Sequence, residues 1–85
     1  MAEEKLVGKI SHYYTNIGVG IIELEDDLAV GDLVHVKGVS TDFEQKVDSM
    51  QIEHAQVEKA GSGQGIGIKV KEKVREGDLV YKIIS

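Results

Sequence analysis

The chain has 85 residues, a net charge of −5 and no cysteine, which excludes a disulfide framework and a thiolate zinc site. A chain of this length forms one small domain, so we expect a single domain over residues 1–85. No apolar run is long enough to span a membrane, and the charged residues that follow Met1 in place of a signal segment predict a cytoplasmic protein.

The first third of the chain predicts a β-hairpin. Residues 5–13 and 17–24 are two β-rich runs, and the polar residues 14–16 between them are typical of a turn. Asn16 and Gly18 can both take the positive φ that a tight reversal needs. An acidic loop then leads to a Gly-Asp pair and a short strand over residues 33–37.

Residues 42–60 carry two conflicting patterns. Phe43, Val47, Met50 and Val57 recur at helical spacing, and the Thr-Asp-Phe-Glu stretch that begins at residue 41 resembles a helix capping box. A strand is also possible, provided that a β-bulge changes the phase of the buried side chains before Met50. Local pattern alone leaves both structures open.

The last third of the chain predicts two more strands. Ile66, Ile68 and Val70 alternate with glycine and lysine after the glycine-rich turn at 61–65, and residues 79–84 form a final apolar run. Turns about ten residues apart favour a small barrel.

The tetrapeptide GDLV occurs twice, at residues 31–34 and 77–80, each time with an apolar residue three positions before the glycine. Glycine and aspartate are typical of turns at strand entrances. Neither copy has the ligand order of a helix-loop-helix calcium site. We interpret both copies as structural turns.

Five short motifs stand in a fixed order: VGKI at 7–10, LAVGDLV at 28–34, VDSMQ at 47–51, GQGIGIKVK at 63–71 and VREGDLV at 74–80. In this order they resemble the β-barrel that follows the GTPase domain in translation factors such as elongation factor Tu. The first half, with its hairpin through residues 13–16, is also similar to the C-terminal barrel of the collagenase-like peptidase family, some members of which act in RNA modification.

The resemblance implies an all-β fold, a small closed six-stranded Greek-key barrel of the translation-factor type, with its core over about residues 5–84. It also implies that residues 42–57 are strand with a bulge or bend rather than helix, since tertiary pairing overrides local pattern.

No catalytic residue, metal site or cofactor is predicted, so the sequence favours a protein that is not an enzyme. The P-loop motif of nucleotide hydrolysis is absent, and no serine or thiol nucleophile stands in a known motif. His12, His35 and His54 lie too far apart in sequence to form a local metal motif.

Three groups of residues remain as candidates for RNA or partner binding. Residues 1–58 carry a charge of −8 and residues 59–85 a charge of +3, so Lys69, Lys71, Lys73 and Arg75 form a local basic run. Tyr13 and Tyr14 could stack on a base or pack on a partner. Gln51 aligns with a glutamate through which the elongation factor Tu barrel holds the aminoacyl end of tRNA.

From these candidates we expect a non-enzymatic binding module related to translation factors that engages RNA or a ribonucleoprotein such as tRNA or the ribosome. The alternative is a protein-interaction adaptor that docks on a separate enzyme or translation protein. In either case we expect a monomer without a nucleotide or membrane partner.

Overall fold

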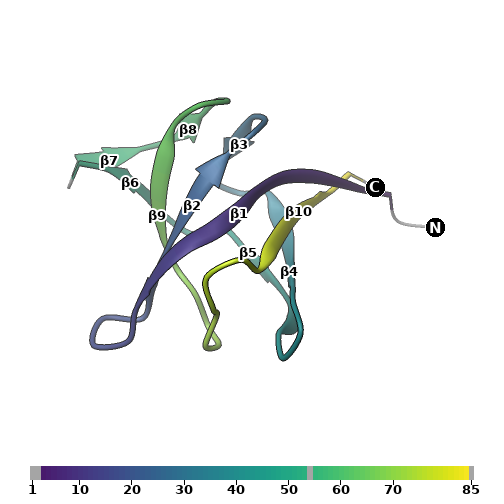
Figure 1. Cartoon of the computed structure of the whole chain (residues 1–85). Helices are drawn as coiled ribbons and strands as arrows, with labels where there is room; N and C mark the ends of the chain where they lie inside the picture. The colour runs from purple at the N-terminus through teal and green to yellow at the C-terminus, as the bar shows by residue number, and fades with distance from the viewer. Residues whose placement is uncertain (1–2, 54, 85) are drawn as a thin grey trace.

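A computed structural model describes residues 3–53 and 55–84, which form ten β-strands and no helix (Figure 1). The strands are β1 (Glu4–Tyr14), β2 (Val19–Leu24), β3 (Leu28–Ala29), β4 (Leu33–Lys37), β5 (Asp42–Lys46), β6 (Met50–Ile52), β7 (Ala55–Val57), β8 (Lys59–Ala60), β9 (Gly65–Lys69) and β10 (Leu79–Ile83). No helix of the described residues is long and apolar enough to span a membrane.

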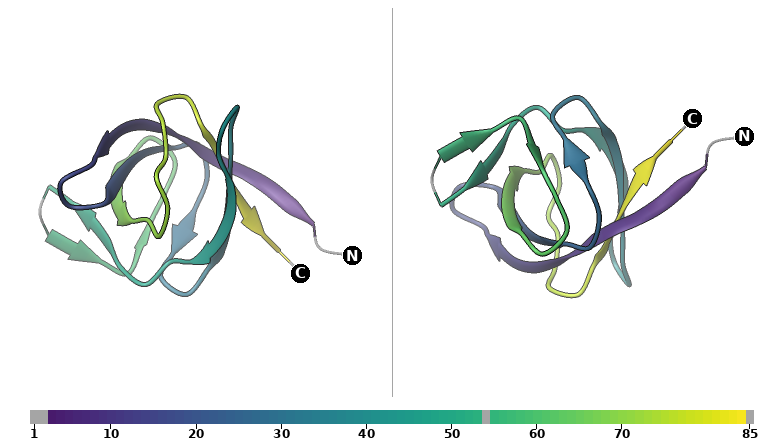
Figure 2. Two further views of the ribbon diagram at one scale, coloured as in Figure 1. Left: turned by 90° about the horizontal axis from the view of Figure 1, so that it is seen from below. Right: turned by 90° about the horizontal axis from the view of Figure 1, so that it is seen from above.

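Eight of these strands form one antiparallel sheet in the order β5-β4-β10-β1-β2-β9-β6-β7, while β3 and β8 pair separately. The strands curl around a common centre (Figure 2). The all-β class is therefore confirmed. The hydrogen-bonded order has two ends, β5 and β7, so the closed six-stranded Greek-key barrel stays a prediction.

The buried apolar side chains of the described residues gather in one cluster inside the curved sheet. They are Val7, Ile10, Ile22, Leu24, Leu28, Val34, Val36, Phe43, Val47, Met50, Ala60, Ile66, Ile68, Val70, Val74 and Val80. Alternation along β9 and β4 places one side chain in two in this core, as expected for strands with one face in solvent.

The side chain of Gln45 links the end strand β5 to the far side of the sheet. Its Nε2 donates to the carbonyl oxygen of Lys69 over 2.8 Å, and its Oε1 accepts from the amide of Lys71 over 2.8 Å. The two bonds imitate the pairing of a neighbouring strand. Gln45 thus joins β5 to the end of β9, to which no ladder of main-chain bonds connects it.

Residues 42–46, 50–52 and 55–57 form strands β5, β6 and β7, so the helical pattern over this segment was misleading. Phe43 pairs with Val36 in the β4–β5 ladder, and the bend at residues 47–49 turns Met50 into the core. Thr41, which resembled a helix cap, instead closes the β4–β5 hairpin, where its carbonyl oxygen accepts from the Gly38 amide over 2.7 Å. His54 lies outside the described residues.

The first hairpin turns later than its sequence predicted. β1 continues to Tyr14 and β2 begins only at Val19. The amide of Gly18, at a φ of 67°, donates to the carbonyl oxygen of Tyr14 over 2.9 Å, so residues 15–18 form the turn. Ile17, which was expected in the strand, therefore lies in the turn and is 62% exposed.

The two Gly-Asp pairs form equivalent turns. Asp32 accepts a hydrogen bond from the Ala29 amide and Asp78 one from the Arg75 amide, each over 2.9 Å and three residues back. The glycines have φ values of 98° and 91°, which favour glycine. Both turns also bond the main chain of a core residue.

That second set of bonds is the same in each copy. The first turn bonds the amide and carbonyl of Val47, and the second bonds those of Ile10, each over 2.8 Å. The repeated tetrapeptide therefore has a structural role: each copy forms the turn at which a strand begins, β4 in the first copy and β10 in the second.

Candidate functional site

A groove of about 450 Å³ lies on the outer face of the sheet, between the first hairpin and the β6–β7 turn. Its lining comes from the hairpin (Tyr14, Ile17, Val19, Ile21), from the β6 side (Gln51, Glu53) and from β9 (Gly65, Ile66, Gly67). We call this the hairpin groove. Four separate strands therefore contribute to one surface.

Glycine forms the floor of the hairpin groove. A Cβ atom at Gly67 would lie 3.2 Å from Val19 Cγ1 and 3.4 Å from Ile21 Cδ1, so its absence lets both side chains lie across β9. At Gly65, no described atom other than those of its chain neighbours lies within 4 Å of the place where a Cβ would be. The floor is thus main chain with open space above it.

The walls of the groove differ in chemistry. Ile17 and Tyr14 are 62% and 48% exposed on the hairpin side, whereas Gln51 and Glu53 supply an amide and a carboxylate on the other side. Apolar pockets with a few polar groups are typical of binding sites. The arrangement suits an apolar side chain of a partner with a hydrogen-bonding group beside it.

The structure brings together two of the predicted binding residues and separates a third. Tyr14 and Gln51 both line the hairpin groove. Tyr13 is half-buried and packs against the core, because successive side chains of a strand point to opposite faces. The paired tyrosines therefore do not act as one stacking surface.

The basic run does not form a strand face. β9 ends at Lys69, so Lys71, Lys73 and Arg75 lie in the exposed connector that follows. Lys69 and Lys71 line a shallow hollow beside Gln45, with the Lys71 Nζ atom 6.0 Å from the centre of the Phe43 ring. The basic run predicted from the sequence therefore lies mainly in a connector, with only Lys69 in a strand.

His35 lies between two carboxylates on the outer face of β4. Its Nδ1 is 2.9 Å from Glu4 Oε2, and its Nε2 is 2.5 Å from Asp42 Oδ1. Only an imidazolium donates from both ring nitrogens at once. The hydrogen bond with Asp42 therefore raises the pKa of His35 above its ordinary value, against the opposing effect of burial, and Glu4 raises this pKa further.

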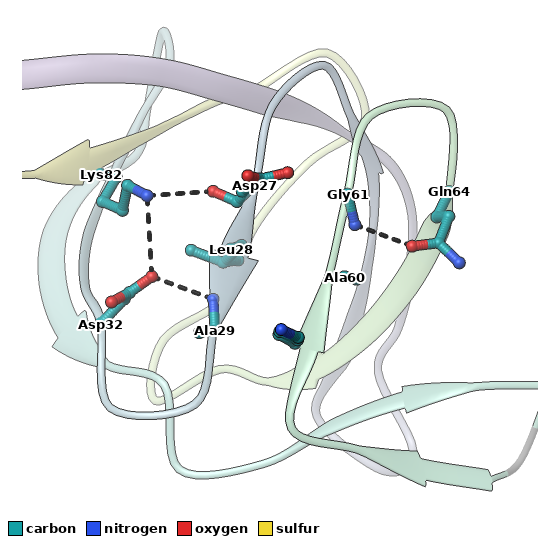
Figure 3. Close-up of a pocket in the computed structure, with 9 residues that line it drawn as sticks. Asp27, Leu28, Ala29, Asp32, Ala60, Gly61, Gln64 and Lys82 are labelled. Atoms are coloured by element: carbon teal, nitrogen blue, oxygen red, sulfur yellow. Dashed lines mark hydrogen bonds and ion pairs between the residues drawn. The ribbon is translucent and has the colours of Figure 1, made fainter.

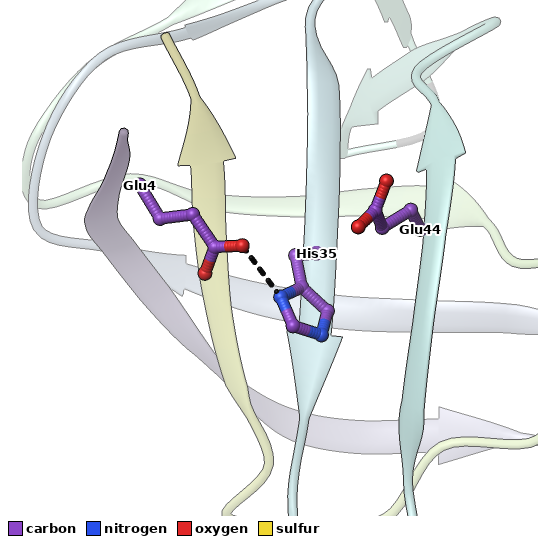
Figure 4. Close-up of side chains that lie close together, drawn as sticks. All are labelled: Glu4, His35 and Glu44. Carbon is purple, nitrogen blue, oxygen red and sulfur yellow. Dashed lines mark hydrogen bonds and ion pairs between the residues drawn. The ribbon is translucent and has the colours of Figure 1, made fainter. Parts of the chain in front are cut away.

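The same cluster has the residue types of a cation site. Ligand atoms of Glu4, His35 and Glu44 lie within 4.8 Å of one another (Figure 4). Both ring nitrogens of His35 already have carboxylate partners, however. This favours a structural role, in which the two ion pairs link β4 to β1 and to β5. His12, by contrast, lies beside Glu76 at 3.4 Å and against the Tyr14 ring.

A second pocket, of about 410 Å³, surrounds the first Gly-Asp turn (Figure 3). Lys82 Nζ donates to the carbonyl oxygen of Asp27 over 3.2 Å and lies 3.9 Å from Asp32 Oδ2. Asp32 in turn accepts from the Ala29 amide, and the Gln64 side chain accepts from the amide of Gly61. These contacts fix the turn and the β8–β9 loop, so the pocket is explained by the fold.

Comparison with known proteins finds relatives that are named as a protease and as collagenases. No family model matches the chain. It is 42% identical over 76 residues to a Methanocaldococcus jannaschii protein named as an uncharacterized protease, covering 88% of this chain and 19% of that protein. It is also 40% identical over 82 residues to a Porphyromonas gingivalis collagenase, covering 94% of this chain and 23% of the collagenase.

These relatives are named as proteolytic enzymes. The chain spans about a fifth of the length of the curated relatives it matches. A crystal structure of the C-terminal domain of a Geobacillus thermoleovorans protein described as a U32 peptidase superposes with a TM-score of 0.86 at 20% identity, covering 92% of this chain and 91% of that one. This last likeness shows the fold.

The comparisons correct the predicted function. The collagenase-like part of the predicted resemblance is supported, whereas the translation-factor part is not. A non-enzymatic translation-factor-like module that binds RNA or the ribosome is contradicted by relatives named protease and collagenase. The chain resembles a domain of peptidases, and of the predicted partners only a protein agrees with these relatives.

Sequence reasoning missed most of the hairpin groove. Ile17, Val19, Ile21 and Gly67 were assigned to strands, and Gly65 to a turn, all without a role in binding. An apolar residue between Asn16 and Gly18, in a turn that is otherwise polar, was the available signal.

Proposed function

We propose that the chain is a domain of a collagenase-like peptidase and that its hairpin groove holds a segment of the protein substrate. The observation that carries the proposal is the 40% identity to a collagenase, spread over 94% of this chain but only 23% of that enzyme. In the relatives, a segment of this size is one part of a much longer polypeptide.

The chemistry of the hairpin groove supports binding of a protein chain. An apolar side chain of the substrate would lie between Ile17 and Tyr14, and the amide of Gln51 would bond a main-chain group beside it. The cytoplasmic location and the monomeric state stay predictions.

A collagenase chimaera tests the proposal. In it, the matching segment of the Porphyromonas gingivalis collagenase is replaced by this chain, and hydrolysis of heat-denatured collagen is measured. We expect the chimaera to retain hydrolysis and deletion of the segment to lower it. Ile17→Lys should lower hydrolysis about tenfold, because it puts a charge where an apolar contact forms.

Val39→Lys is the matched control. Val39 is fully exposed in the β4–β5 turn, away from the groove, so the same change there should leave hydrolysis intact. Unchanged hydrolysis after deletion of the segment would refute the proposal. If Ile17→Lys and Val39→Lys changed hydrolysis equally, the hairpin groove would not be the site that holds the substrate.

A further inference from the structure

A second apolar surface lies on the outer face of β1, β10 and β4. Leu6, Leu33 and Leu79 are 39%, 39% and 36% exposed there, and Tyr81 and Ile83 are half-buried beside them. The register makes them neighbours, since Leu6 pairs with Tyr81 and Leu33 with Ile83. We call these five residues the outer patch.

The outer patch has the composition of an interface. The solvent face of an antiparallel sheet is usually polar, and adjoining exposed apolar side chains mark contact surfaces. Charged groups surround this patch. Lys9 and Lys37 flank Leu79 on the neighbouring strands. His35, with its carboxylate partners Glu4 and Asp42, lies beside Tyr81. An apolar centre with a polar rim is the usual anatomy of a protein contact.

The ends of the described chain identify what the patch would contact. The Ile84 amide donates to the Glu3 carbonyl oxygen over 2.7 Å, and Glu4 pairs with Ile83, so the start of β1 and the end of β10 lie side by side at the edge of the patch (Figures 1 and 2). In relatives about five times longer, the remaining polypeptide connects through these ends. It therefore emerges next to the outer patch.

The hairpin groove lies elsewhere. Its walls come from β2, β9, β6 and Tyr14 at the last position of β1, whereas the outer patch lies on β4, β10 and the first residues of β1. A body packed on the patch would leave the groove open.

We propose that the outer patch is the surface through which this domain packs against the larger remainder of a collagenase-like peptidase. The inference rests on the proposed function, because it takes that remainder as the partner. Interfaces between domains of one chain are more polar than permanent subunit interfaces, which agrees with an apolar centre inside a charged rim.

Cysteine labelling tests the packing, since the chain has no cysteine of its own. Leu33→Cys, Leu79→Cys, Ile17→Cys and Val39→Cys are made one at a time, in the chain alone and in the collagenase chimaera. The rate at which each reacts with a bulky maleimide is followed by peptide mass spectrometry. A solved domain of this fold, of nearly the same extent, supports use of the chain alone.

We expect Leu33→Cys and Leu79→Cys to react about tenfold more slowly in the chimaera than in the chain alone, because burial limits access. Ile17→Cys and Val39→Cys should react equally in both. Two patch positions guard against one variant that misfolds, and Val39→Cys, which is fully exposed, shows whether the chimaera changes the labelling rate in general.

Equal rates at both patch positions, or protection of Ile17→Cys instead, would overturn the proposal. Hydrolysis of denatured collagen is measured on the same chimaeras without label. Loss of substrate hydrolysis with a protected patch refutes the substrate role alone, whereas an unprotected patch with normal hydrolysis refutes the packing alone.

Discussion

The imidazole of His35 makes stability depend on pH, because a carboxylate lies at each ring nitrogen. The pKa of His35 is raised above its ordinary value of 6.5, mainly by the hydrogen bond with Asp42. A raised pKa means that the added stability is complete below the unfolded pKa and is lost as the pH rises through the folded pKa.

We therefore expect Asp42→Asn to lower the free energy of unfolding at pH 6 by about 0.5–1 kcal/mol, since Asp42 is largely exposed. At pH 9 the variant and the unsubstituted chain should be equally stable. Urea unfolding at the two pH values measures the difference. Glu25→Gln, at an exposed carboxylate of the acidic loop, serves as the control and should show no such pH dependence. A loss for Asp42→Asn that is equal at both pH values would contradict the role of His35.

Single residues also show where sequence reasoning reached its limit. Gln51 and Tyr14 were named as residues that bind RNA or a partner, and both line one groove. Of these two kinds of partner, the relatives support only a protein. Tyr13 was grouped with Tyr14 because the two residues are adjacent in the sequence. Strand geometry sends them to opposite faces, and only the register with Gly20 and Val19 reveals which one is outside.

At the scale of the element, β1 depends on a glycine that the sequence did not single out. The ladder of β1 shifts register between Leu6 and Gly8. A Cβ atom at Gly8 would lie 2.5 Å from the Glu23 carbonyl oxygen and 2.8 Å from Ile22 Cγ2. Neither the neighbouring main chain nor a core isoleucine can move away freely.

Gly8→Ala should therefore destabilise the domain by about 2 kcal/mol through overpacking. Gly65→Ala is the matched control, because a Cβ atom there meets open space and should change stability little. Thermal and urea unfolding of both variants compare the two. Equal losses would show that glycine flexibility, rather than close approach, decides the effect.

Element boundaries were predicted where side chains alternate and missed where main-chain bonding decides. The strand at 33–37 was predicted with its bounds, because β4 follows a Gly-Asp turn and alternates clearly. Over residues 42–57 the apolar spacing matched a helix. The pairing of Met50 with Ile68 joins segments far apart in sequence, so a local window does not contain it.

For the whole molecule, the curved sheet relies on Gln45 to hold its end strand. Gln45 forms two hydrogen bonds to β9 and its continuation, across 24 and 26 residues of sequence. Nothing in the sequence marks this glutamine, since its partners are main-chain groups far along the chain.

Gln45→Ala should lower the free energy of unfolding by about 1 kcal/mol, the net value of partly exposed hydrogen bonds. It should also speed amide exchange at Lys71, whose donor bond is lost. Gln56→Ala, at an exposed glutamine of β7, is the control and should do neither. Hydrogen exchange followed by NMR provides both readouts. Unchanged exchange at Lys71 would show that its amide does not bond to the Gln45 side chain.

The two Gly-Asp turns tolerate different residues before the glycine. Each is held by main-chain bonds and a single carboxylate, so the residues before the glycine are constrained only by one buried apolar position. Leu28, Ala29 and Val30 precede the first glycine, whereas Val74, Arg75 and Glu76 precede the second, yet both trace one path. The exposed residues of either turn can therefore be substituted without loss of the hydrogen bonds that fix the course of the chain.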